Sequence, residues 1–427
     1  MNKEFFIGAF YGPTAPMQID DAELGVTHTT KDFANDKYYK LISELGIRYI
    51  TYIENDYNKN PKGVIRDLEL AEKHGLKLFI FDSGITGNMT REQLLERISA
   101  YKDYPSFAGI HVIDEPTTDD YMKHKIDRRI QKYYSVMQLL ADNGITAYMN
   151  LLPYLHFLGT KSAYRKMYDK YIEFCKTPLI SFDRYVFDGG YKFKDWPIRS
   201  FFTNLDIARE YSIKAGIPFC PFIQAGSQWN DEQKHFKSKP YFPTERQMFW
   251  QINCCLLWGA KGIQYFPLIQ PIWFAYGEGN DMDYGRNGII GANGVPTMWY
   301  DAVKHSIAWL RKTESILVDC EHVDVLAKGH YPEKYSGKSK HSDDTIKGIT
   351  LSDENYGTFI GAFKYKKDKK VYIVLNANHD KPANIKIDLA NNYFTILIRE
   401  NASDVMEITD SVQLDLAAGE AALMIVG

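Results

Sequence analysis

Residues 109–116 read Gly-Ile-His-Val-Ile-Asp-Glu-Pro, an apolar run that ends in two adjacent carboxylates. Short β-rich runs of this kind recur along the chain and alternate with amphipathic helical segments. Such alternation is typical of βα units and of a parallel sheet. Acidic side chains at the end of an apolar strand are costly unless they face water or take part in chemistry. This stretch therefore predicts a parallel sheet whose strand ends carry functional residues.

The number of predicted strands distinguishes between two arrangements of such a sheet. The chain contains eight strand-like runs, with helical segments between them. Eight strands favour a closed (β/α)8 barrel, or TIM barrel, over an open doubly wound sheet. The predicted strands span residues 5–11, 48–53, 76–82, 108–114, 146–152, 184–188, 218–223 and 262–268.

The pattern changes near residue 316. A last helix is predicted over residues 298–313, and short alternating strands separated by turns follow it. This pattern is typical of an all-β sandwich. We therefore expect two domains, a barrel over residues 1–315 and a small C-terminal β-sandwich over residues 316–427.

The composition restricts the partners of the chain. Its 427 residues include 51 basic and 54 acidic side chains, and no basic stripe marks a nucleic-acid surface. No apolar stretch is long enough to span a membrane. Aromatic residues make up 14% of the chain, and aromatic rings can stack on the faces of sugars. We expect a carbohydrate partner, no nucleic acid and no membrane span.

The location and the oligomeric state stay open. The chain begins with a predicted strand and not with a signal peptide. We expect an extracellular or bacterial cell-envelope protein if a signal peptide was removed, and a cytoplasmic protein otherwise.

No motif for a metal or an organic cofactor is present. The five cysteines lack metal-ligand spacing. The sequence also has no P-loop, dinucleotide fingerprint, zinc motif or nucleophile-elbow serine. We therefore expect chemistry carried out by side chains, without a cofactor or a metal.

Active sites of (β/α)8 barrels lie at the carboxyl ends of the strands. Asp114 and Glu115 leave the predicted fourth strand at that end. Glycoside hydrolysis uses two carboxyl groups, one of which must be held protonated near neutral pH. A neighbouring negative charge such as Asp114 favours the protonated form of Glu115. Glu115 is therefore the candidate proton donor, although strand-end carboxylates can also cap loops or bind lysines.

These residues resemble a known group of enzymes. Residues 109–116 are similar to the fourth-strand signature of clan A glycoside hydrolases, in which Asn-Glu-Pro carries the acid/base glutamate. Residues 244–266 resemble the helix and eighth strand of β-galactosidase-like barrels, and residues 291–300 resemble the loop and helix that follow. Residues 417–426 resemble the last strand of the β-sandwich that such enzymes carry. The resemblance implies a glycosidase with Glu115 as its acid/base residue.

The chain departs from that group at two positions. Asp114 stands where clan A usually has an asparagine that hydrogen-bonds the sugar 2-hydroxyl. The nucleophilic glutamate of clan A lies at the end of the seventh strand, where this chain has Gln224, which cannot act as a nucleophile. We therefore take Asp188, at the end of the predicted sixth strand, as the second carboxylate. The alternative for Asp188 is a turn before Gly189.

The stereochemistry of hydrolysis stays open. A fourth-strand Glu115 and a sixth-strand Asp188 could leave a gap for an intervening water molecule, which would mean inversion. A shorter separation would mean retention, and the sequence does not determine the distance.

Other polar and aromatic residues at the predicted strand ends are expected to contact the sugar, although each aromatic one could equally belong to the core. These candidate substrate-binding residues are Tyr11, Asp82, Asp114, Asn150, Tyr191, Gln224, Trp229, Tyr265 and Trp273.

Three functional hypotheses follow. The first is a glycosidase in which Glu115 protonates the leaving oxygen and Asp188 activates water or attacks carbon. The second is a carbohydrate-binding barrel that has lost catalysis, because the seventh-strand glutamate is missing. The third is a barrel enzyme of different chemistry, since this fold hosts many reactions.

Overall fold

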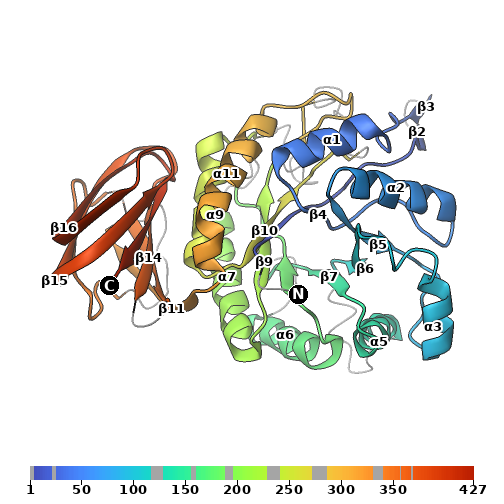
Figure 1. Cartoon of the computed structure of the whole chain (residues 1–427), viewed down its shortest axis with the longest axis horizontal. Coiled ribbons are helices and arrows are strands. Elements are labelled where there is room, and N and C mark those ends of the chain that lie inside the picture. Colours follow the sequence, from blue (N-terminus) through green and yellow to red (C-terminus); the bar gives the residue numbers. More distant parts are fainter. Residues whose placement is uncertain are drawn as a thin grey trace.

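Eight parallel strands close into a barrel, and helices surround it (Figure 1). The computed structural model describes residues 4–21, 26–116, 128–154, 160–187, 196–227, 241–271, 286–329, 340–355, 357–366 and 369–427. The strands follow one another in chain order around the ring, as expected for a (β/α)8 barrel, so the predicted fold class is confirmed. The barrel strands are β1 (Phe6–Ala9), β4 (Tyr49–Ile50), β5 (Lys77–Phe81), β6 (Phe107–Asp114), β7 (Ala147–Leu151), β8 (Ile180–Phe182), β9 (Phe219–Gln224) and β10 (Gly262–Phe266).

Several of the surrounding helices begin at capping residues. The side chains of Thr90 and Thr244 each accept a hydrogen bond from the backbone N–H three residues later. The side chains of Gln93 and Gln247 accept one from the backbone N–H of Thr90 and Thr244, which completes two capping boxes. No helix within the described residues is long and apolar enough to cross a membrane. The helices are α1 (Asp36–Leu45), α2 (Pro61–Lys73), α3 (Arg91–Ile98), α5 (Arg128–Asp142), α6 (Lys161–Cys175), α7 (Trp196–Ala215), α9 (Glu245–Leu257) and α11 (Trp299–Leu317), and β2 (Gln18–Asp21) pairs with β3 (Val26–Thr29) outside the barrel.

The sixth barrel strand differs from the prediction. It lies at Ile180–Phe182, whereas the sequence predicted residues 184–188. Residues 184–187 follow the strand and form no regular element. The residue pattern of this segment resembles that of a strand. However, the preceding Ile-Ser-Phe run is the segment that pairs with β7 and β9. The residue that leaves the sixth strand is therefore Asp183.

Apolar and polar side chains fill different levels of the barrel. Side chains of a strand alternate between inside and outside, so residues two positions apart share a face. In β7, Tyr148 at the base is followed on the inner face by Asn150. In β8, Ser181 is followed in the same way by Asp183. The polar groups thus gather toward the carboxyl ends of the strands, above a hydrophobic base formed by Phe6, Tyr49, Phe79, Tyr148, Leu179 and Cys220.

The C-terminal residues form a separate seven-stranded antiparallel sheet with a core of its own. Strands β13, β14 and β17 bury one face in that core and the other against the barrel domain. Burial on both faces explains why they read as nearly continuous apolar runs. The strands are β11 (Glu321–Lys328), β12 (Ile346–Leu351), β13 (Thr358–Lys364), β14 (Lys370–Asn376), β15 (Ala383–Arg399), β16 (Val405–Leu416) and β17 (Ala421–Val426).

Helix α9 carries much of the contact between this sheet and the barrel (Figure 1). The indole N–H of Trp250 donates to the carbonyl oxygen of Ala377 at 2.9 Å. Arg246 pairs with the buried carboxylate of Glu400 at 2.7 Å. Because these contacts start from a barrel helix and end on the sheet, they stabilise the position of the sheet beside the barrel.

Asp67 in α2 is a buried carboxylate away from the strand ends, and it supports a test of stability against pH. It accepts hydrogen bonds from Asn55 at 2.8 Å and Tyr39 at 3.1 Å, yet burial raises its pKa to about 6. The folded protein therefore holds this proton more tightly than the unfolded chain, so the stabilisation is full at acidic pH and is lost as pH rises through about 6. Two pH units correspond to about 3 kcal/mol. We expect Asp67→Asn to remove this loss.

Urea unfolding at pH 4, 5, 6 and 7 measures the effect. Asp415→Asn, at an exposed position of β16, is the matched control and should keep the pH dependence of the wild type. If the free energy of unfolding changes with pH equally in the wild type and in Asp67→Asn, the expectation is contradicted.

Candidate active site at the carboxyl ends of the barrel strands

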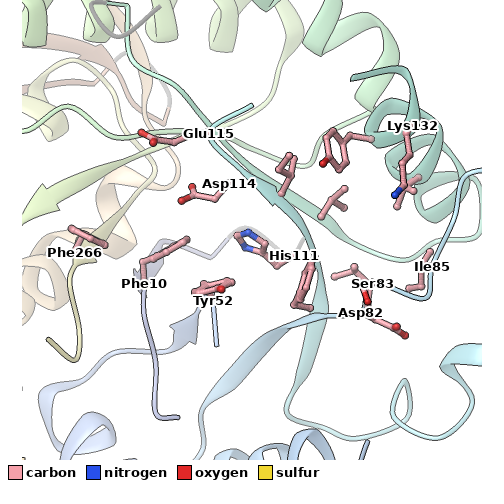
Figure 2. Close-up of a pocket in the computed structure, with 16 residues that line it drawn as sticks. Phe10, Tyr52, Asp82, Ser83, Ile85, His111, Asp114, Glu115, Lys132 and Phe266 are labelled. Carbon is pink, nitrogen blue, oxygen red and sulfur yellow. The ribbon is translucent and has the colours of Figure 1, made fainter. Parts of the chain in front are cut away.

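A cavity of about 550 Å³ opens at the carboxyl ends of β5 and β6. Its walls are formed mainly by aromatic and aliphatic side chains, and two carboxylates, Asp114 and Glu115, lie at one end. Figure 2 shows both carboxyl groups on the side of Phe266 and Phe10, whereas Lys132 of α5 lies on the opposite side of the cavity. A cavity of this size and character suits a small polar ligand with apolar faces.

The backbone at the end of β6 directs these two carboxylates. Asp114 is the last residue of the strand, and Glu115 follows with a φ of 43°. The backbone N–H of Glu115 donates to the carbonyl oxygen of Asn150 at 3.1 Å, which holds this turn against β7. A left-handed conformation is uncommon for a residue with a side chain, and such strain is concentrated at functional sites.

Asp183, which leaves the sixth strand, brings a third carboxylate to the site. The side-chain amide of Asn150 donates to Asp183 at 2.9 Å and to Asp114 at 3.1 Å. Strands β6, β7 and β8 are adjacent in the barrel, so their inward-facing ends place these three residues in one cluster.

Buried polar groups below this cluster fix the orientation of Asn150. Its side-chain oxygen accepts a hydrogen bond from Ser181 at 2.8 Å. Ser181 in turn accepts from Gln264 of β10 at 2.9 Å, and Tyr148 lies 2.9 Å from both. Because both the oxygen and the nitrogen of the Asn150 amide are engaged, the amide points its N–H groups at the two aspartates.

The environment favours protonation of Glu115. Burial raises its pKa, and the charges of Asp183 and Asp114 raise it further, well above the usual range of a glutamate. Burial and the charge of Asp183 also raise the pKa of Asp114, although the hydrogen bond from Asn150 opposes the shift. Asp114 is accessible to solvent through the cavity but lies deep in the barrel mouth. A glutamate held protonated at neutral pH can act as a general acid.

Aromatic rings flank the carboxylates on two sides. Phe10 stacks on Tyr52 with a centroid distance of 4.9 Å, and Phe266 stacks on Tyr185 at 5.5 Å. Burial raises the pKa of Tyr52 to about 12, with further increases from Glu54 and other carboxylates. Tyr185 likewise stays neutral, because burial and the three carboxylates raise its pKa.

His111 lines the cavity but is held as a neutral ring. Its Nδ1–H donates to the carbonyl oxygen of Thr51 at 2.8 Å, which leaves Nε2 without a proton. Burial lowers the pKa of the ring to about 4. His111 is therefore a neutral wall of the cavity near neutral pH.

Two of the predicted sugar-contacting residues are bound to the protein itself. The carboxylate of Asp82 lies 2.6 Å from Arg97 and accepts a hydrogen bond from Tyr101 at 2.9 Å, and Figure 2 shows it pointing away from Asp114. Tyr11 has a φ of 67° and donates its hydroxyl proton to Glu54. The contacts of both residues stabilise strand ends, and Asp82 lies only at the edge of the cavity.

Two further candidates lie away from the cavity. Gln224 is fully buried at the end of β9, where it bonds the N–H and the carbonyl oxygen of Phe187 at 3.0 and 2.7 Å. The hydroxyl group of Tyr265 lies 2.7 Å from Ser306 of α11, because Tyr265 faces the outside of the barrel while Gln264 faces the inside. Neither lines the described part of the cavity.

Asn150 and Asp114 are the predicted contact residues that the structure brings to Glu115. Asp188, Tyr191, Trp229 and Trp273 lie outside the described residues. The sequence reasoning missed Asp183, which alternation from Ser181 could have indicated once the sixth strand was placed correctly. No group of three or more His, Cys, Asp or Glu residues in the described ranges could hold a metal ion.

Comparison with solved structures shows that the fold of this chain is similar to that of glycoside hydrolase structures. No family model matches the chain, and no curated protein matches it. A glycoside hydrolase family 5 protein from Bacteroides vulgatus ATCC 8482 has a TM-score of 0.54 at 10% identity, covering 99% of this chain and 88% of that one.

Two other neighbours are more distant. The GH51 arabinofuranosidase from Xanthomonas axonopodis pv. citri has a TM-score of 0.45 at 10% identity, covering 100% of this chain and 96% of that one. The β-galactosidase from the psychrophilic Marinomonas ef1 has a TM-score of 0.43 at 10% identity. The match covers 73% of this chain and 60% of the β-galactosidase chain. The TM-score of 0.54 with the family 5 protein confirms the expected likeness to glycoside hydrolase barrels for the fold.

Proposed function

We propose that this chain is a glycosidase in which Glu115 donates the proton to the leaving oxygen of a glycosidic bond. The observation that carries the proposal is the pair of carboxyl groups of Asp114 and Glu115 at one end of a largely apolar cavity, with Asp183 joined to Asp114 through Asn150. The glycoside hydrolase fold of the structural neighbours supports it at the level of architecture.

The chemistry follows from the environment of the acid. The aromatic walls present apolar ring faces to the C–H faces of a sugar. Glu115 transfers its proton to the glycosidic oxygen as the C–O bond breaks, so that the leaving group departs as an alcohol. The ionised Asp114 and Asp183 stabilise the positive charge that develops on the sugar in the transition state.

The second carboxylate of the reaction must lie across the scissile bond. Two such carboxyl groups are about 5–5.5 Å apart in retaining enzymes and about 6.5–9.5 Å apart in inverting ones. Asp183 and Asp114 both accept hydrogen bonds from the side-chain amide of Asn150, so Asp183 lies on the same side of the cavity as Asp114 and Glu115. We therefore propose Asp188, five residues further along the chain, for the role of base or nucleophile.

A screen of oligosaccharides with NMR detection of the product anomer tests the proposal. Hydrolysis of at least one glycan is expected, with a single anomer formed first. Turnover that is unaffected by Asp188→Asn would remove that residue from the mechanism.

A carbohydrate-binding barrel without catalysis is the second candidate. The buried amide of Gln224 at the end of the seventh strand favours it, because this amide hydrogen-bonds the backbone of Phe187 and Gly226. Glycan binding by calorimetry without any product after days of incubation would support this candidate and contradict the first.

A further inference from the structure

We propose that the cavity takes a glycan that carries a carboxylate or sulfate group, and that Lys132 of α5 pairs with that anionic group. The inference names a substrate class for the proposed glycosidase and rests on that function for its catalytic meaning. The binding itself is a separate claim, because it can be measured without turnover.

The two ends of the cavity differ in charge. Asp114 and Glu115 lie at one end, and Lys132 lies on the opposite side (Figure 2). Lys132 is the single lysine or arginine among the described residues that line the cavity. The ring of His111, which also lines it, is neutral near neutral pH. An anionic group of a ligand therefore meets a cation at the Lys132 end, whereas any ionised carboxylate at the other end repels it.

One face of α5 borders the cavity. Residues three or four positions apart share a face of a helix, and Lys132, Tyr133 and Val136 all line the cavity. Val136 is buried, whereas Lys132 is exposed. The apolar side chain therefore anchors this face of the helix, and the ammonium group stays available to a ligand.

Packing around α5 fixes the place of that face. A Cβ atom at Gly87 would lie 2.2 Å from the Cβ atom of Ser135, so the backbone of the segment after β5 packs directly on the helix. Ile85 of the same segment is buried and also lines the cavity. Because α5 is packed against this segment, the backbone that carries Lys132 has a fixed position in the cavity wall.

No carboxylate among the described residues forms an ion pair with Lys132. Asp82, at the edge of the cavity, is paired with Arg97 at 2.6 Å and accepts a hydrogen bond from Tyr101. Helix α5 offers no acidic partner either, because positions 128, 129, 135 and 136, one turn away, hold Arg, Arg, Ser and Val. An ammonium group of this kind can form a charge-assisted hydrogen bond with an anionic ligand.

A charged sugar also suits the rest of the cavity. The volume of about 550 Å³ is in the range of small-ligand sites, and the lining is mainly aromatic and aliphatic. Sugars with a carboxylate or sulfate combine a C–H face, which packs on aromatic rings, with one negative charge. Such a ligand can pack its C–H face on the walls and place its charge at Lys132, with its glycosidic oxygen toward Glu115.

Calorimetry on the full chain with matched glycans tests the inference. Oligosaccharides of chondroitin sulfate and of galacturonan are titrated before and after reduction of their carboxyl groups, and the chondroitin set also after removal of sulfate. We expect at least one acidic oligosaccharide to bind about tenfold more tightly than its neutralised counterpart, the scale of one charge-assisted hydrogen bond. Loss of this preference on reduction identifies a carboxylate, and loss on desulfation identifies a sulfate.

Three variants assign the preference to one side chain. Lys132→Gln should lower the ratio of acidic to neutralised affinity by about tenfold, whereas Lys132→Arg should keep most of it, because arginine retains the charge. Lys170→Gln is the matched control, since Lys170 is an exposed lysine of the neighbouring helix α6 and does not line the cavity. The preference of the wild type should weaken as salt rises, because an exposed pair is screened.

The outcomes separate the inference from the proposed function. Equal binding of acidic and neutralised oligosaccharides, no binding of any acidic probe, or a ratio that falls no more in Lys132→Gln than in Lys170→Gln would overturn the inference. Hydrolysis of neutral glycans together with any of these results would leave the proposed glycosidase standing. Binding of an acidic oligosaccharide through Lys132 without turnover of any glycan would uphold the inference and contradict the proposed glycosidase.

Discussion

Glu115→Gln is expected to lower the hydrolysis of an oligosaccharide by about 10²–10⁴-fold, the usual contribution of general acid catalysis. Glutamine matches the shape of glutamate, but it has no proton to give to the leaving oxygen. The loss should be much smaller for an aryl glycoside with an acidic phenol as its leaving group, because such a group departs without protonation. Initial rates on matched alkyl and aryl glycosides measure both effects.

Glu54→Gln is the matched control. Glu54 is another half-buried glutamate at a strand end, where it accepts a hydrogen bond from Tyr11. Its replacement should not show the dependence on leaving group that identifies the proton donor. If Glu54→Gln shows that dependence and Glu115→Gln does not, the assignment of the acid is wrong.

The part of the site that was predicted from the sequence depends on one strand. The apolar run before Asp114 and Glu115 indicates a buried strand with acidic residues at its end, and its position as fourth of eight indicates the open end of a barrel. Both follow from local composition and chain order, which a sequence displays directly. The fold class and the candidate acid were therefore accessible before the structure.

The remaining site residues depend on register, which a sequence displays poorly. The three-residue strand β8 is too short to show its own alternation, and the segment after it alternates better, so the sequence predicts a strand that ends at Asp188 and does not indicate Asp183. In β10, whether Tyr265 or one of its neighbours reaches the cavity depends on which face of the strand points into the barrel. Gln264 faces inward and Tyr265 outward, so the residue that reaches the cavity is Phe266.

The role of Gln224 also depends on a long-range contact. A polar residue at the end of an apolar strand predicts a ligand contact or a structural hydrogen bond equally well. The structure places it against Phe187, whose loop follows a different strand. Only the tertiary arrangement distinguishes the two uses of such an amide.

Gly109→Ala is expected to destabilise the barrel and to reduce activity together. Gly109 has a φ of 154°, and a Cβ atom there would overlap the carbonyl oxygen of Thr146, which accepts the N–H of Ile110 at 2.8 Å. The pairing of β5 with β6 shifts register at this point, so Gly109 lies beside a β-bulge. Steric overlap and backbone strain together predict a loss of about 2–5 kcal/mol in the free energy of unfolding.

The activity should fall because the same strand ends in Asp114 and Glu115, and a displaced strand tilts both carboxylates away from Asn150. Gly144→Ala is the matched control: Gly144 has a φ of 73°, but a Cβ atom added there would meet no described atom within 4 Å, so only the left-handed backbone costs energy, about 1–2 kcal/mol. Urea unfolding and initial rates of both variants measure the difference. Equal losses of stability in the two variants would show that β6 tolerates a side chain at position 109, and that the bulge does not set the direction of Asp114 and Glu115.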